Sequence, residues 1–260
     1  MTPQLAEALG FAVVLGAVIR PLLVATILVG LWQALKRAKL GLRLRLRAWV
    51  TVAVGLIGWL TLFWILAERG FFARLSDSAQ MAQAGLIVVP IIALVIGSLL
   101  AVTRSETIAA GIDAAPLWWL IAYQVYRVAG FIFVRLWSYG FLPGYFALPA
   151  GIGDMLTAVF ALLVVGAFLQ NSPWAKPLAY GVNTFGMIDL LNAITLGVLS
   201  SRSATIHTSP LLIYPLVLVP SFGVPLAFII HALSIWQLRR REAVPSGFAV
   251  YGLNKSGETA

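Results

Sequence analysis

Three charged residues interrupt apolar stretches of the sequence, and their types could form a binding site inside a membrane. Arg20, Arg127 and Asp189 each stand about twelve residues into such a stretch, which is about 16–18 Å along a helix. A lone charge at that depth costs roughly 2.5–3.5 kcal/mol. We therefore expect these groups to be paired or hydrated, with the Asp189 carboxylate as the counter-ion of one or both arginines.

A site of this kind suits a small polar solute. Two guanidinium groups that face one carboxylate leave an excess of positive charge, which favours an anionic solute or a lipid headgroup. Polar residues one helical turn before Arg127, and a polar stripe on the helix that carries Asp189, extend the site. The residues predicted to bind the solute are Arg20, Tyr123, Gln124, Arg127, Asn183, Asp189 and Asn192.

Two further ionisable residues are candidates for proton coupling or gating. Asp154 ends the sequence GIGD, which predicts a place in the first turn of a helix, where free N–H groups favour a carboxylate. His231 lies within an apolar stretch and can change its charge near neutral pH. The other histidine, His207, is expected in a loop at a different depth, and the chain has no cysteine. No metal and no other cofactor are therefore predicted.

The composition predicts an all-α integral membrane protein. Apolar residues make up 61% of the 260 residues and charged residues 10%, whereas soluble domains carry about 25% charged residues. A helix needs about 20 apolar residues to cross the hydrocarbon core, and seven stretches come close to or exceed that length. These stretches are residues 8–33, 48–66, 82–102, 115–137, 151–170, 177–200 and 211–238. We expect residues 1–241 to form one domain of seven transmembrane helices, followed by a short, poorly ordered cytoplasmic tail at 242–260.

Two stretches are expected to depart from regular helix. Residues 138–154 hold two prolines and four glycines, which predicts a re-entrant or interfacial segment in place of a continuous helix. The last span contains Pro215, Pro220 and Pro225 and should be bent or locally unwound.

The positions of the basic residues predict the orientation of the chain in the membrane. The loop at 36–47 is rich in lysine and arginine, and Arg239, Arg240 and Arg241 follow the last span. Cytoplasmic loops carry an excess of these residues, so the N-terminus is expected outside and the C-terminus in the cytoplasm. The basic loop is also expected to contact anionic lipid headgroups. The pattern is typical of small multi-pass proteins of the bacterial cytoplasmic, or inner, membrane.

Several classes of function are not predicted. The net charge of +9 follows from the orientation signal, so nucleic-acid binding is not expected. No lysine lies in a predicted span, which argues against a retinal Schiff base, and no G-x-S-x-G, P-loop or dinucleotide motif is present. An enzyme is not predicted, because acid/base work by Asp154 and Asp189 would require these residues to come within one water of each other.

Two interpretations of the buried charges remain open. In the first, the chain is a multi-pass protein that binds or transports a small solute through a polar site at the membrane midplane. In the fullest form of this hypothesis the solute is anionic and its transport is coupled to protons. In the second, the chain is a non-transporting membrane subunit, or a sensor of lipid or partner proteins, whose charges only lock helices together. Association with further copies of the chain or with a larger membrane complex is compatible with both.

Overall fold

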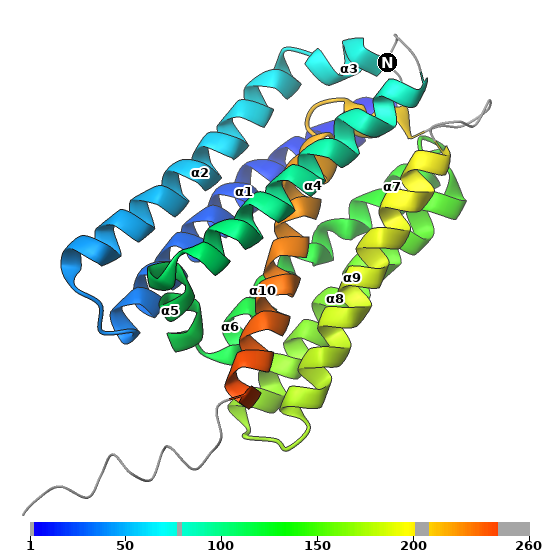
Figure 1. Cartoon of the computed structure of the whole chain (residues 1–260). Helices are drawn as coiled ribbons and strands as arrows, with labels where there is room; N and C mark the ends of the chain where they lie inside the picture. Colours follow the sequence, from blue (N-terminus) through cyan, green and yellow to red (C-terminus); the bar gives the residue numbers. More distant parts are fainter. Residues whose placement is uncertain (1–2, 77–79, 201–207, 244–260) are drawn as a thin grey trace, which may run out of the picture.

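A computed structural model describes residues 3–76, 80–200 and 208–243, and every regular element in these ranges is a helix (Figure 1). The elements are α1 (Pro3–Arg37), α2 (Leu42–Glu68), α3 (Phe71–Ser76), α4 (Gln80–Arg104), α5 (Glu106–Ala114), α6 (Leu117–Ala122), η1 (Tyr123–Gly130), α7 (Phe131–Ser138), α8 (Gly144–Leu169), α9 (Ala175–Ser200), η2 (Ser209–Leu212), η3 (Val219–Gly223) and α10 (Val224–Ala243). Here η1 and η2 are 3₁₀ helices and η3 is a π-helix. His207 and nearly all of the predicted tail lie outside the described residues.

By length and composition, six described helical runs could cross a membrane, and the count rises to seven if one bent pair forms a single span. The six are Gly10–Arg37, Leu42–Glu68, Leu117–Ser138, Gly144–Leu169, Ala175–Ser200 and Val219–Glu242. The bent pair joins Ile91–Arg104 to Glu106–Ala114 at an angle of 92°. The all-helical architecture with several apolar, membrane-length helices is therefore confirmed.

The long helices run side by side and give the bundle two ends. In Figure 1, α3 lies at one end, called the α3 end below, and it contacts η2 there. Helix α5 and the turns that join α1 to α2 and α8 to α9 lie at the other end, called the α5 end. The 3₁₀ helix η1 contacts α1, α8 and α10, which places it inside the bundle.

Helix α8 begins at Gly144, so the prediction of a re-entrant or interfacial segment in place of helix over residues 138–154 is wrong from Gly144 onward, and the break in the helix is confined to residues 139–143. Pro143 precedes the first turn as the N-cap residue, and Pro149 lies inside the helix, where it removes one backbone hydrogen bond. Small buried residues follow along the same helix: Ala147, Ala150, Gly151 and Gly153. Such residues let neighbouring helices approach closely, which stabilises a membrane helix even where proline weakens its backbone.

The connection after α4 contains a helix, α5, that the sequence analysis missed. The Ser105 hydroxyl accepts a hydrogen bond from the backbone N–H of Ile108 at 3.3 Å and caps the helix. Glu106 lies in the first turn, where the helix dipole favours a carboxylate. Ile108 and Ile112 are buried in one apolar cluster with Leu35. Helix α5 therefore lies across the end of the bundle with its apolar face packed inward.

Two side chains of α10 bind the last carbonyl groups of α5. Nε2 of Gln237 donates hydrogen bonds to the carbonyl oxygens of Ile112 and Ala115, both at 2.6 Å. Nη2 of Arg241 donates to the carbonyl oxygen of Asp113 at 2.7 Å. The last carbonyls of a helix have no partner within that helix, so these hydrogen bonds satisfy the end of α5 and join it to α10.

The chain before α10 is irregular, as its three prolines predicted. The π-helix η3 lies directly before α10 and frees backbone carbonyls through its wider turn. Nε1 of Trp59 donates to the carbonyl oxygen of Ser221 at 3.0 Å, and the hydroxyl of Tyr126 donates to that of Gly223 at 2.7 Å. The freed carbonyls thus have partners inside the bundle, as a membrane interior requires.

The span predicted over residues 115–137 is also not a uniform α-helix. Its ends are α6 and α7, and its middle is the eight-residue 3₁₀ helix η1. Runs of 3₁₀ helix longer than about four residues are uncommon and often mark a functional or strained segment. The residues of η1 are therefore the first to consider for a functional site.

Gln237→Ala removes both hydrogen bonds from this side chain to α5. Both carbonyls keep one other partner, so the loss is that of two hydrogen bonds, each worth about 0.5–1.5 kcal/mol. We therefore expect the amides of α5 to exchange hydrogen about ten-fold faster, as measured by mass spectrometry in detergent. Arg239→Ala changes an exposed position on the same helix and should leave exchange unaltered. Equal exchange in both variants would show that Gln237 does not hold α5.

Candidate functional site

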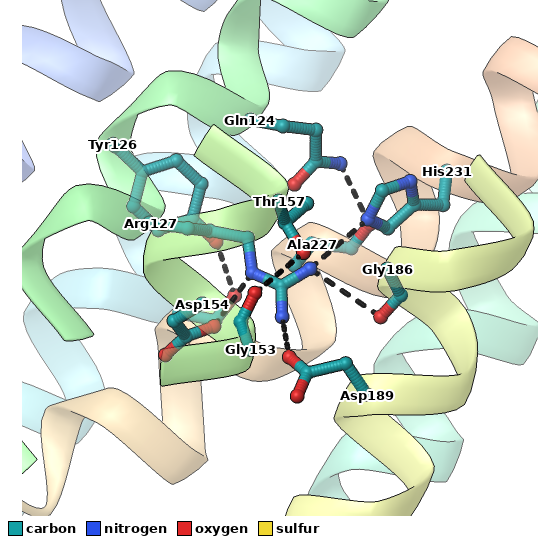
Figure 2. A network of polar contacts seen from close by, with 11 residues as sticks. Gln124, Tyr126, Arg127, Gly153, Asp154, Thr157, Gly186, Asp189, Ala227 and His231 are labelled. Atoms are coloured by element: carbon teal, nitrogen blue, oxygen red, sulfur yellow. Dashed lines mark hydrogen bonds and ion pairs between the residues drawn. The ribbon is translucent and has the colours of Figure 1, made fainter. Parts of the chain in front are cut away.

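A buried guanidinium at the middle of the bundle joins four helical elements (Figure 2). Arg127, on η1, has 2% of its side chain exposed. Its Nε donates to Oδ1 of Asp154 on α8 at 2.6 Å, and its Nη2 donates to Oδ2 of Asp189 on α9. Its Nη1 contacts the carbonyl oxygen of Gly186 on α9 and Nε2 of His231 on α10, both at 3.3 Å. The protein therefore engages all three nitrogens of the guanidinium.

The hydrogen bonds of His231 determine its tautomer. Because Nη1 of Arg127 is a donor, Nε2 of His231 must accept, and Nδ1 carries the proton that it donates to Oδ1 of Asn183 at 2.9 Å. Nδ2 of Asn183 donates in turn to the carbonyl oxygen of Ala179 at 2.7 Å and to the hydroxyl of Ser234 at 2.9 Å. His231 is therefore neutral in this arrangement, and a hydrogen-bonded chain runs from Arg127 toward the α5 end.

We call Arg127, Asp154, Asp189, His231 and Asn183 the polar centre, and its charges differ from those that the sequence predicts. The ion pair between Arg127 and Asp189 forms as predicted. The second charged partner of Arg127, however, is the carboxylate of Asp154. One guanidinium faces two carboxylates, which leaves an excess of one negative charge when both are ionised. The excess of positive charge that led to the prediction of an anionic solute does not form here.

The sequence predicts Asp154 in the first turn of its helix, and this is wrong. Because α8 begins at Gly144, Asp154 is the eleventh residue of the helix and lies in its interior. A helix that starts earlier brings this carboxylate to the depth of Arg127. The Asp154 side chain is 17% exposed, against 2% for Arg127, so the carboxylate is the accessible part of that ion pair.

Arg20 lies on a cavity that it shares with the polar centre. Its guanidinium folds over Gly16, one turn earlier in α1, and its Nη2 donates to the carbonyl oxygen of Pro215 at 3.0 Å. The cavity has a volume of about 110 Å³ and mainly apolar walls. Its polar lining residues are Arg20, Tyr126, Arg127 and Asp154. The pairing of Arg20 with Asp189, the alternative that the sequence left open, does not occur.

A second cavity, of about 90 Å³, lies beside the first and extends toward the α3 end. Its lining includes Thr208 and Ser209, which lie at the start of η2, together with Asp154. The two cavities share five lining residues: Phe133, Asp154, Leu190, Val219 and Val224. Asp154 is the charged residue among these five, so its carboxylate lies at the border between the cavities.

Glycines make room for the side chains of the polar centre. At three positions, a Cβ atom would overlap a charged or polar group that the adjacent helix presents. The pairs are Gly130 with Asp154, Gly153 with Asp189, and Gly186 with His231. Each glycine lies on one helix of the centre and faces a side chain of the next. The sequence analysis missed this role, because glycines in membrane spans also serve general close packing.

The other residues predicted to bind solute lie outside the polar centre. Gln124 is buried, and its Nε2 donates to the carbonyl oxygen of Ala227 at 3.3 Å, while its Oε1 has no partner among the residues that the structure describes. The hydroxyl of Tyr123 donates to a backbone carbonyl of α1 at 2.8 Å. Asn192 is exposed on α9 and lines an outer groove that also reaches Asp189. Within the described ranges, no group of three or more His, Cys, Asp or Glu side chains is placed to hold a metal ion.

Comparison with known proteins gives one match. A family model with the description "Domain of unknown function (DUF8737)" matches residues 79–239. No curated protein and no solved structure matches the chain. The matched range contains every residue of the polar centre, whereas Arg20 and the rest of α1 and α2 precede it.

Arg127→Gln removes the cation that two buried carboxylates share. Removing one partner of a buried ion pair costs about 3–5 kcal/mol, so we expect a large fall in the thermal unfolding temperature of the purified protein in detergent. Adding Asp154→Asn and Asp189→Asn to this variant removes the uncompensated charges and should restore part of the stability. Native stability of the single variant would contradict the central role of Arg127.

Gly153→Ala places a methyl group on the Asp189 carboxylate. We expect it to destabilise the protein by about 1–3 kcal/mol through overpacking, as measured by thermal unfolding. Gly166→Ala is the matched control on the same helix, because a Cβ atom there meets no atom within 4 Å. Alanine is the better helix former by about 1 kcal/mol, so the control should be neutral or stabilising. A similar effect of both substitutions would exclude a specific role of Gly153.

Proposed function

We propose that this chain, which belongs to the DUF8737 family, is a multi-pass membrane protein that binds a small solute beside Arg127 and transports it, with a proton exchanged at the two carboxylates. The cavity beside the charged groups is the main observation that supports this proposal. A lock between helices needs no open space, but about 110 Å³ adjoins the charged groups here. Apolar walls with a few polar groups are the usual form of small-molecule sites.

The two carboxylates supply the exchangeable charge. An uncompensated negative charge inside a membrane is costly, so a proton or a positive group of the solute is expected on one of them. Asp154 is the better placed of the two, because it borders both cavities. Exchange of its proton for a solute would couple solute binding to protonation.

Helical segments that are not α-helices border the cavity, and they support the proposal that the site changes conformation. The 3₁₀ helix η1 contributes Tyr126 and Arg127, and the π-helix η3 contributes Val219 and Phe222. Such segments recur at functional sites, and interrupted helices form the binding sites of many transporters.

A lock between helices is the second candidate function, and one observation favours it. Arg127 is 2% exposed and has protein partners on all three guanidinium nitrogens. In that case the polar centre would only stabilise the bundle of a non-transporting subunit, and solute flux would be absent from a correctly folded protein.

In this proposal the α5 end faces the cytoplasm of a bacterial inner membrane. The basic segment 36–47, which comprises the end of α1, a turn and the start of α2, lies at that end and would contact anionic lipid headgroups. Arg37 lies over the ring of Trp119 at 4.5 Å, and Arg45 over that of Trp32 at 5.5 Å. Tryptophan prefers the headgroup level, so these pairs support a membrane surface here.

A protonated carboxyl group in the polar centre predicts an infrared signal. At neutral pH we expect the purified protein to show the C=O stretch of a protonated carboxylic acid, and Asp154→Asn or Asp189→Asn to remove it. In liposomes that contain a pH-sensitive dye, a pool of small amines, carboxylates and zwitterions should change the internal pH through the native protein and not through Asp154→Asn.

Glu106→Gln, at an exposed position of α5, is the control and should leave both the infrared band and the flux unchanged. A band that survives both aspartate substitutions would exclude the proposed proton site. Normal folding without flux for any member of the pool would favour the lock.

A further inference from the structure

Two of the four polar residues that line the first cavity are already committed to protein partners. The hydroxyl of Tyr126 donates to the carbonyl oxygen of Gly223 at 2.7 Å. Arg127 is bound on all three of its nitrogens. Arg20 and Asp154 each have a single hydrogen bond to protein among the described residues, so these two groups are the better placed to meet a solute.

Arg20 and Asp154 each retain unused hydrogen-bonding capacity. A guanidinium has five N–H donors, and the described residues give Arg20 one hydrogen bond, from Nη2 to the carbonyl oxygen of Pro215 at 3.0 Å. Its remaining donors suit a carboxylate, which arginine binds through two parallel hydrogen bonds. Oδ1 of Asp154 accepts a hydrogen bond from Nε of Arg127 at 2.6 Å, and Oδ2 can accept one from an ammonium group.

The cavity thus has one positive and one negative group on its wall. Because Asp154 shares Arg127 with Asp189, an anion at Arg20 would leave the excess negative charge of the two carboxylates without a counter-ion. A cation at Asp154 would leave Arg20 without one. A charge left unpaired in a site with few polar atoms is costly, so a site with two opposite charges discriminates strongly against ligands that lack one of them. A solute that carries both charges matches both groups.

The remaining walls limit the size and character of the solute. They are apolar, and include Ile132, Phe133, Leu216 and Phe222. A water molecule needs about 10–15 Å³ of such volume, so a cavity of about 110 Å³ holds several waters or a solute of a few heavy atoms. We propose that the solute is a small zwitterion with a short apolar body, whose carboxylate binds Arg20 and whose ammonium group binds Asp154; this rests on the proposed function.

Matched probes test this assignment on the purified full-length protein in detergent. Alanine is compared with propionate and ethylamine, and 4-aminobutyrate with butyrate and butylamine, so that each zwitterion has partners that lack one charge. We expect at least one zwitterion to bind about ten-fold or more tightly than both of its partners, by equilibrium binding and by thermal shift.

Two variants assign the ends of the ligand. Arg20→Gln should reduce the affinity for the zwitterion to that for the matched amine, and Asp154→Asn should reduce it to that for the matched acid. Arg43→Gln, at an exposed position in the first turn of α2, is the control and should leave binding unchanged. The thermal unfolding temperature of each ligand-free variant shows whether it is folded.

The outcomes separate this inference from the function on which it rests. The assignment of a zwitterion is wrong if an amine or an acid binds as tightly as its matched zwitterion. It is also wrong if none of the probes binds. If flux in liposomes still depends on Asp154 in those cases, the proposed transport stands with another solute class. If flux and the protonated carboxyl signal are both absent, the proposed function fails as well.

Discussion

The shared guanidinium of Arg127 is the interaction on which the arrangement of the other helices depends. Lipid tails are as apolar as leucine, so helices in a membrane gain little from burying apolar surface against each other, and polar contacts and close packing decide how they associate. A buried cation that is not fully paired is costly. Arg127 meets this requirement by taking partners from α8, α9 and α10. Those helices must therefore approach η1 closely, and the glycines that face charged side chains make this approach sterically possible.

The polar centre is asymmetric along the long axis of the bundle. On the side toward the α5 end, His231, Asn183 and Ser234 form a closed hydrogen-bonded chain. On the other side, Asp154 borders two cavities, one of which extends to the start of η2. The centre is thus closed toward the α5 end and has free space toward the α3 end. A protein that alternates between two access states would have such an arrangement in one of them, and a symmetric lock would not need it.

The sequence allowed the pair of Arg127 with Asp189 to be predicted, because charges at one depth of a bilayer must find partners. The same counting failed for Asp154, since prolines and glycines suggested a late helix start, although in a membrane close packing keeps such residues helical. A search for membrane spans also missed α5, because its nine residues are too few to cross a bilayer. The Ser105–Glu106 cap was the available signal. The place of Arg20 on a cavity depends on tertiary contacts with the chain before α10, which no local pattern contains.

The winding of η1 has a mechanical consequence. Eight residues advance about 16 Å as a 3₁₀ helix and about 12 Å as an α-helix. Rewinding this segment would therefore shorten the span by about 4 Å and rotate its side chains about the axis. Arg127 is the fifth of the eight residues, so it would move about 2.5 Å relative to α6. A change of helical pitch alone, without any hinge or rigid rotation of the bundle, would thus move the guanidinium by about the length of the 2.6 Å hydrogen bond that joins it to Asp154.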